Sequence, residues 1–331
     1  MINISIAKGE NRKQNIAKAL SLIDKEICDS IKRKNPEQLF IKINAIDINF
    51  PLACTHPDAL EAALNYFSKF NFNEIIVGDN TFAFSKEGTN PYTKLSAKFK
   101  NIRFSDLTDF PKKQITLETI YGEKTAMISF LPKMAFTVSL TIPKTHDTFV
   151  YTGAGKNMVG CVLTGRSYIH GLPFLKRIFL NLVVESNRFN CNNLIKVVAT
   201  ALPDLAILDA FEAMEGNGPM FGTAVPMHIA MASTDCIALD LFTAKITGLS
   251  DAPYLKKFSN CEDKINNTTL IKHGFSELAD ISKDFKKHYL FKYQTSNRWK
   301  FYYAPFDFVF PISIIKRWYR LRDKIVEKLK N

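Results

Sequence analysis

The chain has 331 residues, more than a single hydrophobic core usually holds, which predicts one large α/β unit with an appendage or two modest domains. Its composition, with 46% hydrophobic and 23% charged residues and no internal repeat, excludes a disordered or fibrous protein. The net charge of +12 is unevenly placed: residues 256–331 hold 17 Lys and Arg against 8 Asp and Glu, whereas residues 1–255 hold 27 against 24. We therefore expect a nearly neutral core domain over residues 1–255 and a basic, aromatic-rich extension over residues 256–331.

The six cysteines are scattered, without a C-x-x-C pair or a spacing that suits zinc or an iron–sulfur cluster, so they are expected to be reduced thiols. The N-terminal segment lacks the apolar core of a signal peptide, and no run of about 18 apolar residues could span a bilayer. These features predict a cytoplasmic protein.

Strands and helices alternate through the first half of the chain. An apolar stripe from Asn15 to Ile31 predicts one helix, and Thr55 followed by Pro57 predicts the capped start of another that runs to Phe70. A further helix is expected over residues 92–99. Strands are predicted at Leu39–Ile43, Glu74–Val77 and Ile102–Phe104.

The pattern changes between residues 114 and 130, where two extended runs flank Tyr121–Lys124, as in a β-hairpin inserted in or beside the sheet. Strands are then predicted at Phe136–Ile142, Leu205–Leu208 and Met227–Ala232, and helices at Asn192–Ala201 and Asp235–Gly248. The expected fold class is α/β: a mostly parallel sheet with crossover helices, one inserted β-hairpin and a C-terminal basic, aromatic helical extension.

Polar residues follow five of the predicted strands. Ligands of open parallel sheets bind at the carboxyl ends of the strands, so these residues are expected to converge on one site. The alternative for each aspartate is that it only caps a helix or turn. The residues are Asn44, Asp79, Asn80, Lys144, His146, Asp209, Glu215, Thr234 and Asp235.

Two glycine-rich segments are candidate ligand loops. The first, Gly153-Ala154-Gly155-Lys156-Asn157, lies in an expected polar loop over residues 143–170. It is not a Walker loop, because that pattern needs Gly at Val150 and Ser or Thr at Asn157. Its amides, with Lys144 and Lys156, would suit an anion such as phosphate or carboxylate, the alternative being a flexible surface turn. The second is the tight turn Glu215-Gly216-Asn217-Gly218-Pro219.

Four histidines, His56, His146, His170 and His228, could transfer protons or bind a metal ion, because imidazole titrates near neutral pH. No H-x-x-x-H or H-E-x-x-H spacing supports a preformed metal site, and structural roles explain His56, as a helix cap, and His228 better. His146 beside Lys144 is the strongest catalytic candidate. Glu215 could act as an acid/base or magnesium ligand, or could only fix its turn.

Three blocks together resemble one known family: IKINAIDINFPLACTHPDALEAAL, IPKTHDTFVYTGAGKNMVGCVLTG, and PDLAILDAFEAMEGNGPMFGTAV followed by MASTDCIALDLFTAKITGL. They resemble the "domain of unknown function 362" family over roughly residues 40–248. Many relatives carry an appended ferredoxin-like domain, whose cysteines this chain lacks, so an iron–sulfur cluster is not expected. The resemblance implies motif positions at Lys42, Asn44, Thr55, His56, Pro57, Lys144, His146, Lys156, Asn157, Gly160, Glu215, Gly216, Asn217, Gly218, Asp235 and Asp240.

The segment from Lys287 onward mixes aromatic and basic residues and holds both tryptophans. Ile314, Trp318, Leu321, Ile325 and Leu329 would share one helical face. Such a helix could dock on its own domain or lie on a membrane surface through residues 311–331, and RNA binding is a further alternative.

Together these features predict a cytoplasmic α/β enzyme that acts on an anionic small molecule, with or without a divalent metal ion. The alternatives are a binding or scaffold module whose basic tail reaches a membrane surface or nucleic acid, and a redox or iron–sulfur-associated protein. The catalytic candidates are His146, Glu215 and Lys144, and the ligand-binding candidates are Lys42, Asn44, Thr55, His56, Asp79, Lys156, Asn157, Gly216, Asn217 and Asp235.

Overall fold

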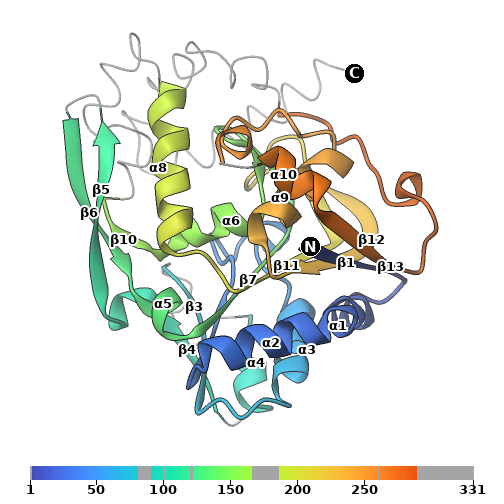
Figure 1. Ribbon diagram of the computed structural model, residues 1–331, viewed down its shortest axis with the longest axis horizontal. Coiled ribbons are helices and arrows are strands. Elements are labelled where there is room, and N and C mark those ends of the chain that lie inside the picture. The colour runs from blue at the N-terminus through green and yellow to red at the C-terminus, as the bar shows by residue number, and fades with distance from the viewer. Residues whose placement is uncertain are drawn as a thin grey trace.

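A mixed α/β architecture with a ten-stranded sheet organises the protein, as the sequence predicts. The computed structural model describes residues 2–80, 91–99, 101–119, 122–165, 186–258 and 261–288. The main strand order is β13-β1-β12-β11-β7-β2-β3-β4, and β8 and β9 extend the sheet beside β11 (Figure 1). The bounds are β1 Ile2–Lys8, β2 Gln38–Lys42, β3 Glu74–Asp79, β4 Ile102–Asp106, β7 Phe136–Thr141, β8 Lys144–His146, β9 Val150–Thr152, β11 Leu205–Glu215, β12 Thr223–Ser233 and β13 Thr268–His273.

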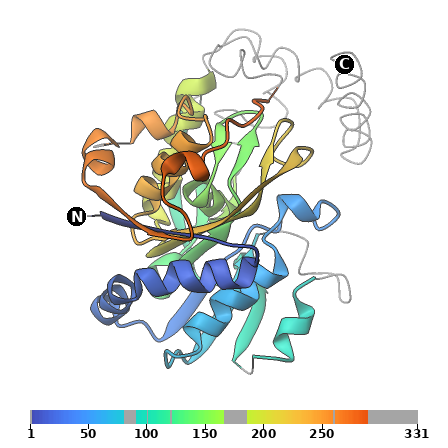
Figure 2. The same ribbon diagram turned by 90° about the vertical axis from the view of Figure 1, so that its right-hand side faces the viewer.

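Helices cover both faces of this sheet. Figure 1 shows α1 to α4 on one side and α6, α8 and α9 on the other, and Figure 2 gives the same separation from a second direction. Their bounds are α1 Arg12–Leu22, α2 Asp24–Lys34, α3 Pro57–Phe67, α4 Thr93–Ser96, α5 Leu131–Met134, α6 Ala154–Asn157, α8 Ser186–Thr200, α9 Cys236–Ile246 and α10 Cys261–Asn266. Short 3₁₀ turns are η1 Pro51–Ala53, η3 Leu107–Asp109, η4 Met158–Cys161, η6 Leu255–Lys257 and η7 Leu278–Asp280.

The two faces of the sheet bury two separate apolar clusters. Along β2, Leu39 and Ile41 point into the cluster under α1 to α3, whereas Phe40 points into the cluster under α8 and α9. This alternation follows from the two-residue period of a strand. Since both faces are covered, the central strands are apolar throughout, as the buried pattern of β7 also shows.

The strand order reverses direction between β2 and β7. The chain runs from β2 outward to β3 and β4, and later from β7 to its neighbour β11 on the opposite side. All of these neighbouring pairs are parallel. In open α/β sheets such a switch point, at the carboxyl ends of the strands, is where ligands bind.

The inserted hairpin is confirmed. Strands β5 (Lys112–Thr119) and β6 (Gly122–Ser129) pair antiparallel and form a three-stranded sheet with β10 (Val162–Thr164).

The first predicted helix is wrong in one respect, because α1 and α2 are two helices that meet at Ile23. Ile23 has φ −122° and ψ 29°, outside the helical region, yet its side chain is 1% exposed in the same apolar cluster as Ile16 and Ile27. The apolar stripe therefore continues across the break, which is why the sequence pattern indicates one helix. Strand β1 was not anticipated at all.

The expected parallel arrangement of the last two core strands is also wrong. Strand β11 does not stop at Leu208 but continues to Glu215, and it pairs antiparallel with β12. Only residues 216–222 connect the two strands, whereas a parallel crossover needs a dozen residues or more. The turn that follows Glu215 is thus the tip of a hairpin.

Residues beyond 255 contribute to this fold. Strand β13 pairs in parallel with β1 at the edge of the main sheet. The predicted tail helix over residues 314–329 and His170 lie outside the described residues. Over the residues that the structure describes, no helix combines the length and apolar character that crossing a membrane requires.

Candidate functional site

A buried ion pair lies at the carboxyl ends of β2 and β3. The Nζ atom of Lys42 lies 2.7 Å from Oδ1 of Asp79, and the side chains are 1% and 7% exposed. The Lys42 ammonium also donates to the backbone oxygen of Ile43 at 2.7 Å. Asp79 in turn accepts from the backbone amides of Ala45 and Asn80. Lys42 and Asp79 are both predicted ligand-binding residues, and the fold brings their side chains together.

Asn157 connects this pair to β7 across the switch point. Its Nδ2 donates to the backbone oxygen of Lys42 at 2.9 Å and to Oγ of Ser139 at 3.1 Å, and its Oδ1 lies 3.5 Å from Nζ of Lys42. Ser139 donates to the backbone oxygen of Ala154, which begins α6. The sequence did not single out Ser139, although it is a polar residue in an otherwise apolar strand.

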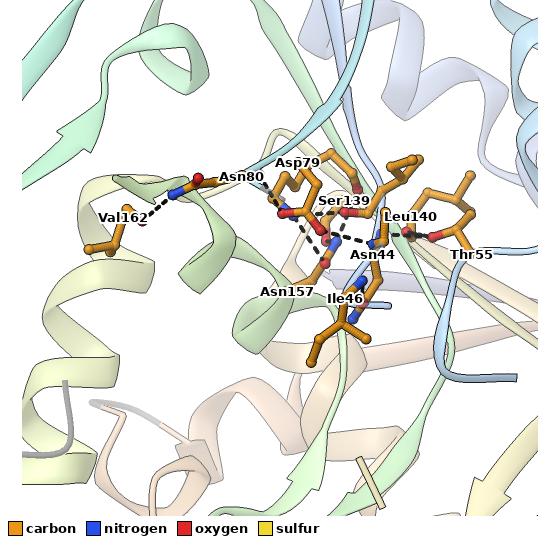
Figure 3. Close-up of polar contacts among 12 residues, drawn as sticks. Asn44, Ile46, Thr55, Asp79, Asn80, Ser139, Leu140, Asn157 and Val162 are labelled. Carbon is orange, nitrogen blue, oxygen red and sulfur yellow. Dashed lines mark hydrogen bonds and ion pairs between the residues drawn. The ribbon is translucent and has the colours of Figure 1, made fainter. Parts of the chain in front are cut away.

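Thr55 joins the same switch point from the other side of β2. Its Oγ1 accepts from the backbone amide of Asn44 and donates to the backbone oxygen of Leu140, both at 2.8 Å (Figure 3). Thr55 does not cap α3, contrary to the prediction, because its hydroxyl bonds to Asn44 and Leu140. His56 caps that helix, since its Nδ1 accepts from the amide of Asp58 at 3.1 Å.

Lys144 brings a second buried ammonium to this edge of the sheet. It is 1% exposed, and its Nζ donates to the backbone oxygen of Ala53 at 2.6 Å. Burial is the main cause that lowers the pKa of Lys144 to about 8. The charges of Cys54 and Asp79 oppose this shift, and the charge of Lys42 makes a smaller contribution in the same direction as burial. In the part of the chain that the structure describes, Asp79 is the one carboxylate that contacts either ammonium.

A short segment with a small apolar cluster of its own covers Lys144. Ala53 packs there with Ile142 and Met214, and Phe50 and Leu52 lie partly buried against them. The ring of Phe50 meets the ring of Phe221 edge to face at 5.0 Å. We call residues 50–54 the covering segment.

The glycine-rich segment after β9 already binds a carboxyl group of the protein itself. Asp240, fully buried on α9, accepts from the backbone amides of Ala154 and Gly155, both at 2.8 Å. A Cβ atom at Gly153 would lie 2.1 Å from Oδ1 of Asp240, so this glycine is needed for the approach. The amides that the sequence offered to a bound anion are therefore occupied by the protein's own carboxyl group.

His146 and Lys156 lie near this segment, away from the Lys42 pair. Nδ1 of His146 accepts from the amide of Thr148 at 2.9 Å and lies 2.8 Å from Oδ1 of Asp147, two contacts that require different tautomers. Burial, then the charge of Lys156, lower the pKa of His146 to about 4, so its ring is neutral at neutral pH. Lys156 lies over the ring of Phe149, 5.2 Å from its centroid. The expected polar loop is thus built from short buried strands.

The turn after β11 holds the backbone of Lys286 through hydrogen bonds. Oε2 of Glu215 accepts from the amide of Lys286 at 2.7 Å, and the amide of Gly216 donates to the backbone oxygen of Lys286. The backbone oxygen of Asn217 accepts from Phe221 within the turn. These contacts bind residue 286 to the hairpin tip, which fits the simpler explanation that Glu215 fixes its turn.

Two predicted strand-end aspartates do not join the Lys42 pair. Asp235 caps α9, as the alternative explanation held. Because β12 runs antiparallel to β11, Asp235 lies beside the amino-terminal end of β11, at the opposite end of the strands from the Lys42 pair. Asp209 lies inside β11 rather than at its end, where Arg12 contacts both its oxygens at 3.1–3.3 Å. Burial raises the pKa of Asp209 to about 6.

The predicted histidine and carboxylate residues were also candidate ligands of a divalent metal ion. Among the described residues, no group of three or more His, Cys, Asp or Glu side chains is arranged to hold a metal ion. Cys54, Cys161 and Cys236 are buried and form no disulfide among the described residues.

Comparisons with known proteins identify the region that holds these residues. A family model described as "Domain of unknown function (DUF362)" matches residues 39–245. The chain is also similar to "Thylakoid-associated protein sll1697" of Synechocystis sp., with 32% identity over 117 residues. That alignment covers 35% of this chain and 33% of the relative, so the chain matches about a third of the relative's length.

Proposed function

Because the chain belongs to the DUF362 family, and the matched region contains Lys42, Asp79 and Lys144, we propose that it is an enzyme that binds a small anionic molecule at this switch point. One observation carries the proposal: among the described residues, one of two buried ammonium groups, that of Lys42, contacts a carboxylate, whereas that of Lys144 contacts only a neutral backbone oxygen. Burying a charge without a partner is costly, so a positive excess at a ligand-binding edge favours an anionic ligand.

Lys144 is the group expected to contact the ligand. Lys42 is held by Asp79 and by the backbone oxygen of Ile43, whereas Nζ of Lys144 has one neutral acceptor, the backbone oxygen of Ala53. An incoming phosphate or carboxylate oxygen would form a charge-assisted hydrogen bond with Lys144. The catalytic roles of His146 and Glu215 stay predictions, and their contacts do not favour them over Lys144.

The binding proposal predicts that inorganic phosphate or a small dicarboxylate such as malate raises the unfolding temperature of the full chain, and that Lys144→Met abolishes the rise. Methionine retains the apolar contacts of the side chain and removes its charge. The measurement is thermal unfolding over a concentration series of each anion at constant ionic strength. At a ligand concentration 100 times the Kd, the expected stabilisation is about 2.7 kcal/mol.

Lys133→Met is the matched control, because Lys133 is exposed on α5. This variant should respond to the anions as the unchanged protein does. An equal response of the Lys144→Met variant, or no response of the unchanged protein to any of the anions, would contradict binding at this site.

A second candidate function is contact with a membrane surface, favoured by the name of the thylakoid-associated relative and by the basic, aromatic composition of residues 311–331. Replacing Lys316, Arg317, Arg320 and Lys324 with glutamine in the full chain should release the protein from vesicles that contain anionic phosphatidylglycerol. Each basic residue near such a surface contributes about 1 kcal/mol, so the loss should be large and measurable by vesicle sedimentation. Equal sedimentation of both proteins would rule out this role for the segment.

A further inference from the structure

We infer that the Nζ atom of Lys144 forms an imine with the carbonyl carbon of a small anionic aldehyde or ketone, such as a 2-oxo acid. The inference rests on the proposed function and deepens it, because it assigns a substrate class and a reaction to the same site. It is carried by the contacts that distinguish Lys144 from Lys42.

The two lysines have different partners at the same edge of the sheet. Asp79 pairs with Lys42 at 2.7 Å and is further held by the amides of Ala45 and Asn80. Lys42 is therefore a fixed positive charge. Lys144, with the backbone oxygen of Ala53 as its one hydrogen-bond acceptor among the described residues, keeps two of its three N–H groups available for another partner.

An amine must lose its proton before it can attack a carbonyl carbon, and the surroundings of Lys144 favour that loss. The side chain is 1% exposed, and removal from water is a condition that activates a nucleophilic lysine. Burial lowers the pKa of Lys144 from 10.5 to about 8. At neutral pH the neutral fraction of this amine is then on the order of 100-fold larger than that of an ordinary lysine.

The same arrangement selects an anionic carbonyl compound. Imine formation removes none of the positive charge at the site, because a protonated imine also carries one charge. A carboxylate or phosphate on the substrate would balance the charge excess of the two lysines, and would place the adjacent carbonyl group beside Nζ.

Access requires the covering segment to move, and its apolar packing is limited. Its apolar cluster contains three buried residues, whereas the two main clusters of the sheet contain many more. The bond from Lys144 to Ala53 and the contact between Phe50 and Phe221 hold the segment over the amine. Segments with few buried apolar contacts open at a lower free energy than the core.

The reaction is balanced without an oxidant or reductant. The nitrogen lone pair of the neutral amine attacks the carbonyl carbon, and the carbonyl π electrons move to oxygen, which takes up a proton that the nitrogen releases. The hydroxyl group of the resulting carbinolamine takes up a second proton, equal to the one that the ammonium released to solvent, and leaves as water while the nitrogen lone pair forms the C=N bond. The product is a protonated imine between the substrate carbon and Nζ of Lys144.

Borohydride reduction tests the inference because it converts an imine to a stable secondary amine. The full-length protein is incubated with glyoxylate or pyruvate at neutral pH, reduced, digested and mapped by mass spectrometry. We expect one adduct per chain, on Lys144, with labelling of Lys133 lower by at least about 10-fold. Inorganic phosphate should suppress the labelling of Lys144 and leave that of Lys133 unchanged.

The outcomes separate this inference from the proposed function. If anions stabilise the protein but neither carbonyl compound labels Lys144, the imine is overturned and anion binding stands. If Lys144 is labelled no faster than Lys133, or phosphate does not protect it, the imine is likewise overturned. Because phosphate protection is measured on the unchanged protein, the test does not depend on whether Lys144→Met folds.

Discussion

Replacing Asp79 with asparagine is expected to lower the free energy of unfolding by about 3–5 kcal/mol, because it leaves the ammonium of Lys42 buried without a compensating charge. The carboxylate also accepts hydrogen bonds from the amides of Ala45 and Asn80. An asparagine has one acceptor oxygen, so its NH₂ group must face at least one of these three donors. Urea unfolding monitored by circular dichroism measures the change.

A double variant distinguishes loss of the ion pair from general disruption. Lys42→Met combined with Asp79→Asn removes both charges, and should recover part of the stability that Asp79→Asn alone loses. Asp263→Asn, at an exposed position on α10, serves as the control and should change stability by less than about 0.5 kcal/mol. If Asp79→Asn behaves like that control, the buried pair does not hold this edge of the sheet together.

The second large effect concerns Asp240 and pH. Asp240→Asn should destabilise the protein at acidic pH by about 1–3 kcal/mol, because the amide replaces one of the two oxygens that accept from Ala154 and Gly155. As the pH rises from about 5 to about 8, the difference from the unchanged protein should shrink and then change sign.

The pH dependence follows from the direction of the pKa shift. Burial raises the pKa of Asp240 from 3.8 to about 7, against the opposing hydrogen bonds from Gly155, Ala154 and Tyr151. The folded protein therefore binds a proton that the unfolded chain has released between these two values. The stability that this proton contributes is complete below about pH 4 and is lost as the pH rises through about 7, by about 4 kcal/mol in all.

Comparing the two proteins at each pH isolates this one group, because the titrations of His146 and Asp209 are common to both. Urea unfolding at several pH values supplies the measurement, with Asp263→Asn again as the control. A difference between Asp240→Asn and the unchanged protein that stays constant, or that grows with pH, would mean that the two amide hydrogen bonds outweigh burial.

Much of the fold could be predicted because the central strands are short apolar runs with clear ends. Asn44 follows β2 and Asp79 ends β3, so the rule for parallel sheets found both residues. Lys42, the last residue of β2, was implied by the family resemblance. The rule misplaced Asp235 because it assumed that β12 runs parallel to its neighbours. The predicted strands left residues 209–226 between them, enough for a crossover, whereas the longer strands of the structure leave only residues 216–222.

Other parts of the site could not be predicted from local pattern. Asp240 lies inside α9 with no local hydrogen-bonding role, and the amides that it accepts from are 85 and 86 residues away in sequence. Lys144 was expected in a polar loop, but tertiary packing buries it completely in a short strand. The depth of burial, which decides its pKa, is a property of the assembled protein.

The pairing of β1 with β13 at the edge of the main sheet determines how far the protein can be shortened. Residues 39–245 define the family match, yet β1 precedes that region and β13 follows it. If the chain ended at residue 245, β1 would lose its outer partner and expose a row of unpaired amide and carbonyl groups. Such an edge pairs with other chains and promotes aggregation. A fragment cut at the bounds of the family match would therefore lack strands that the folded protein needs.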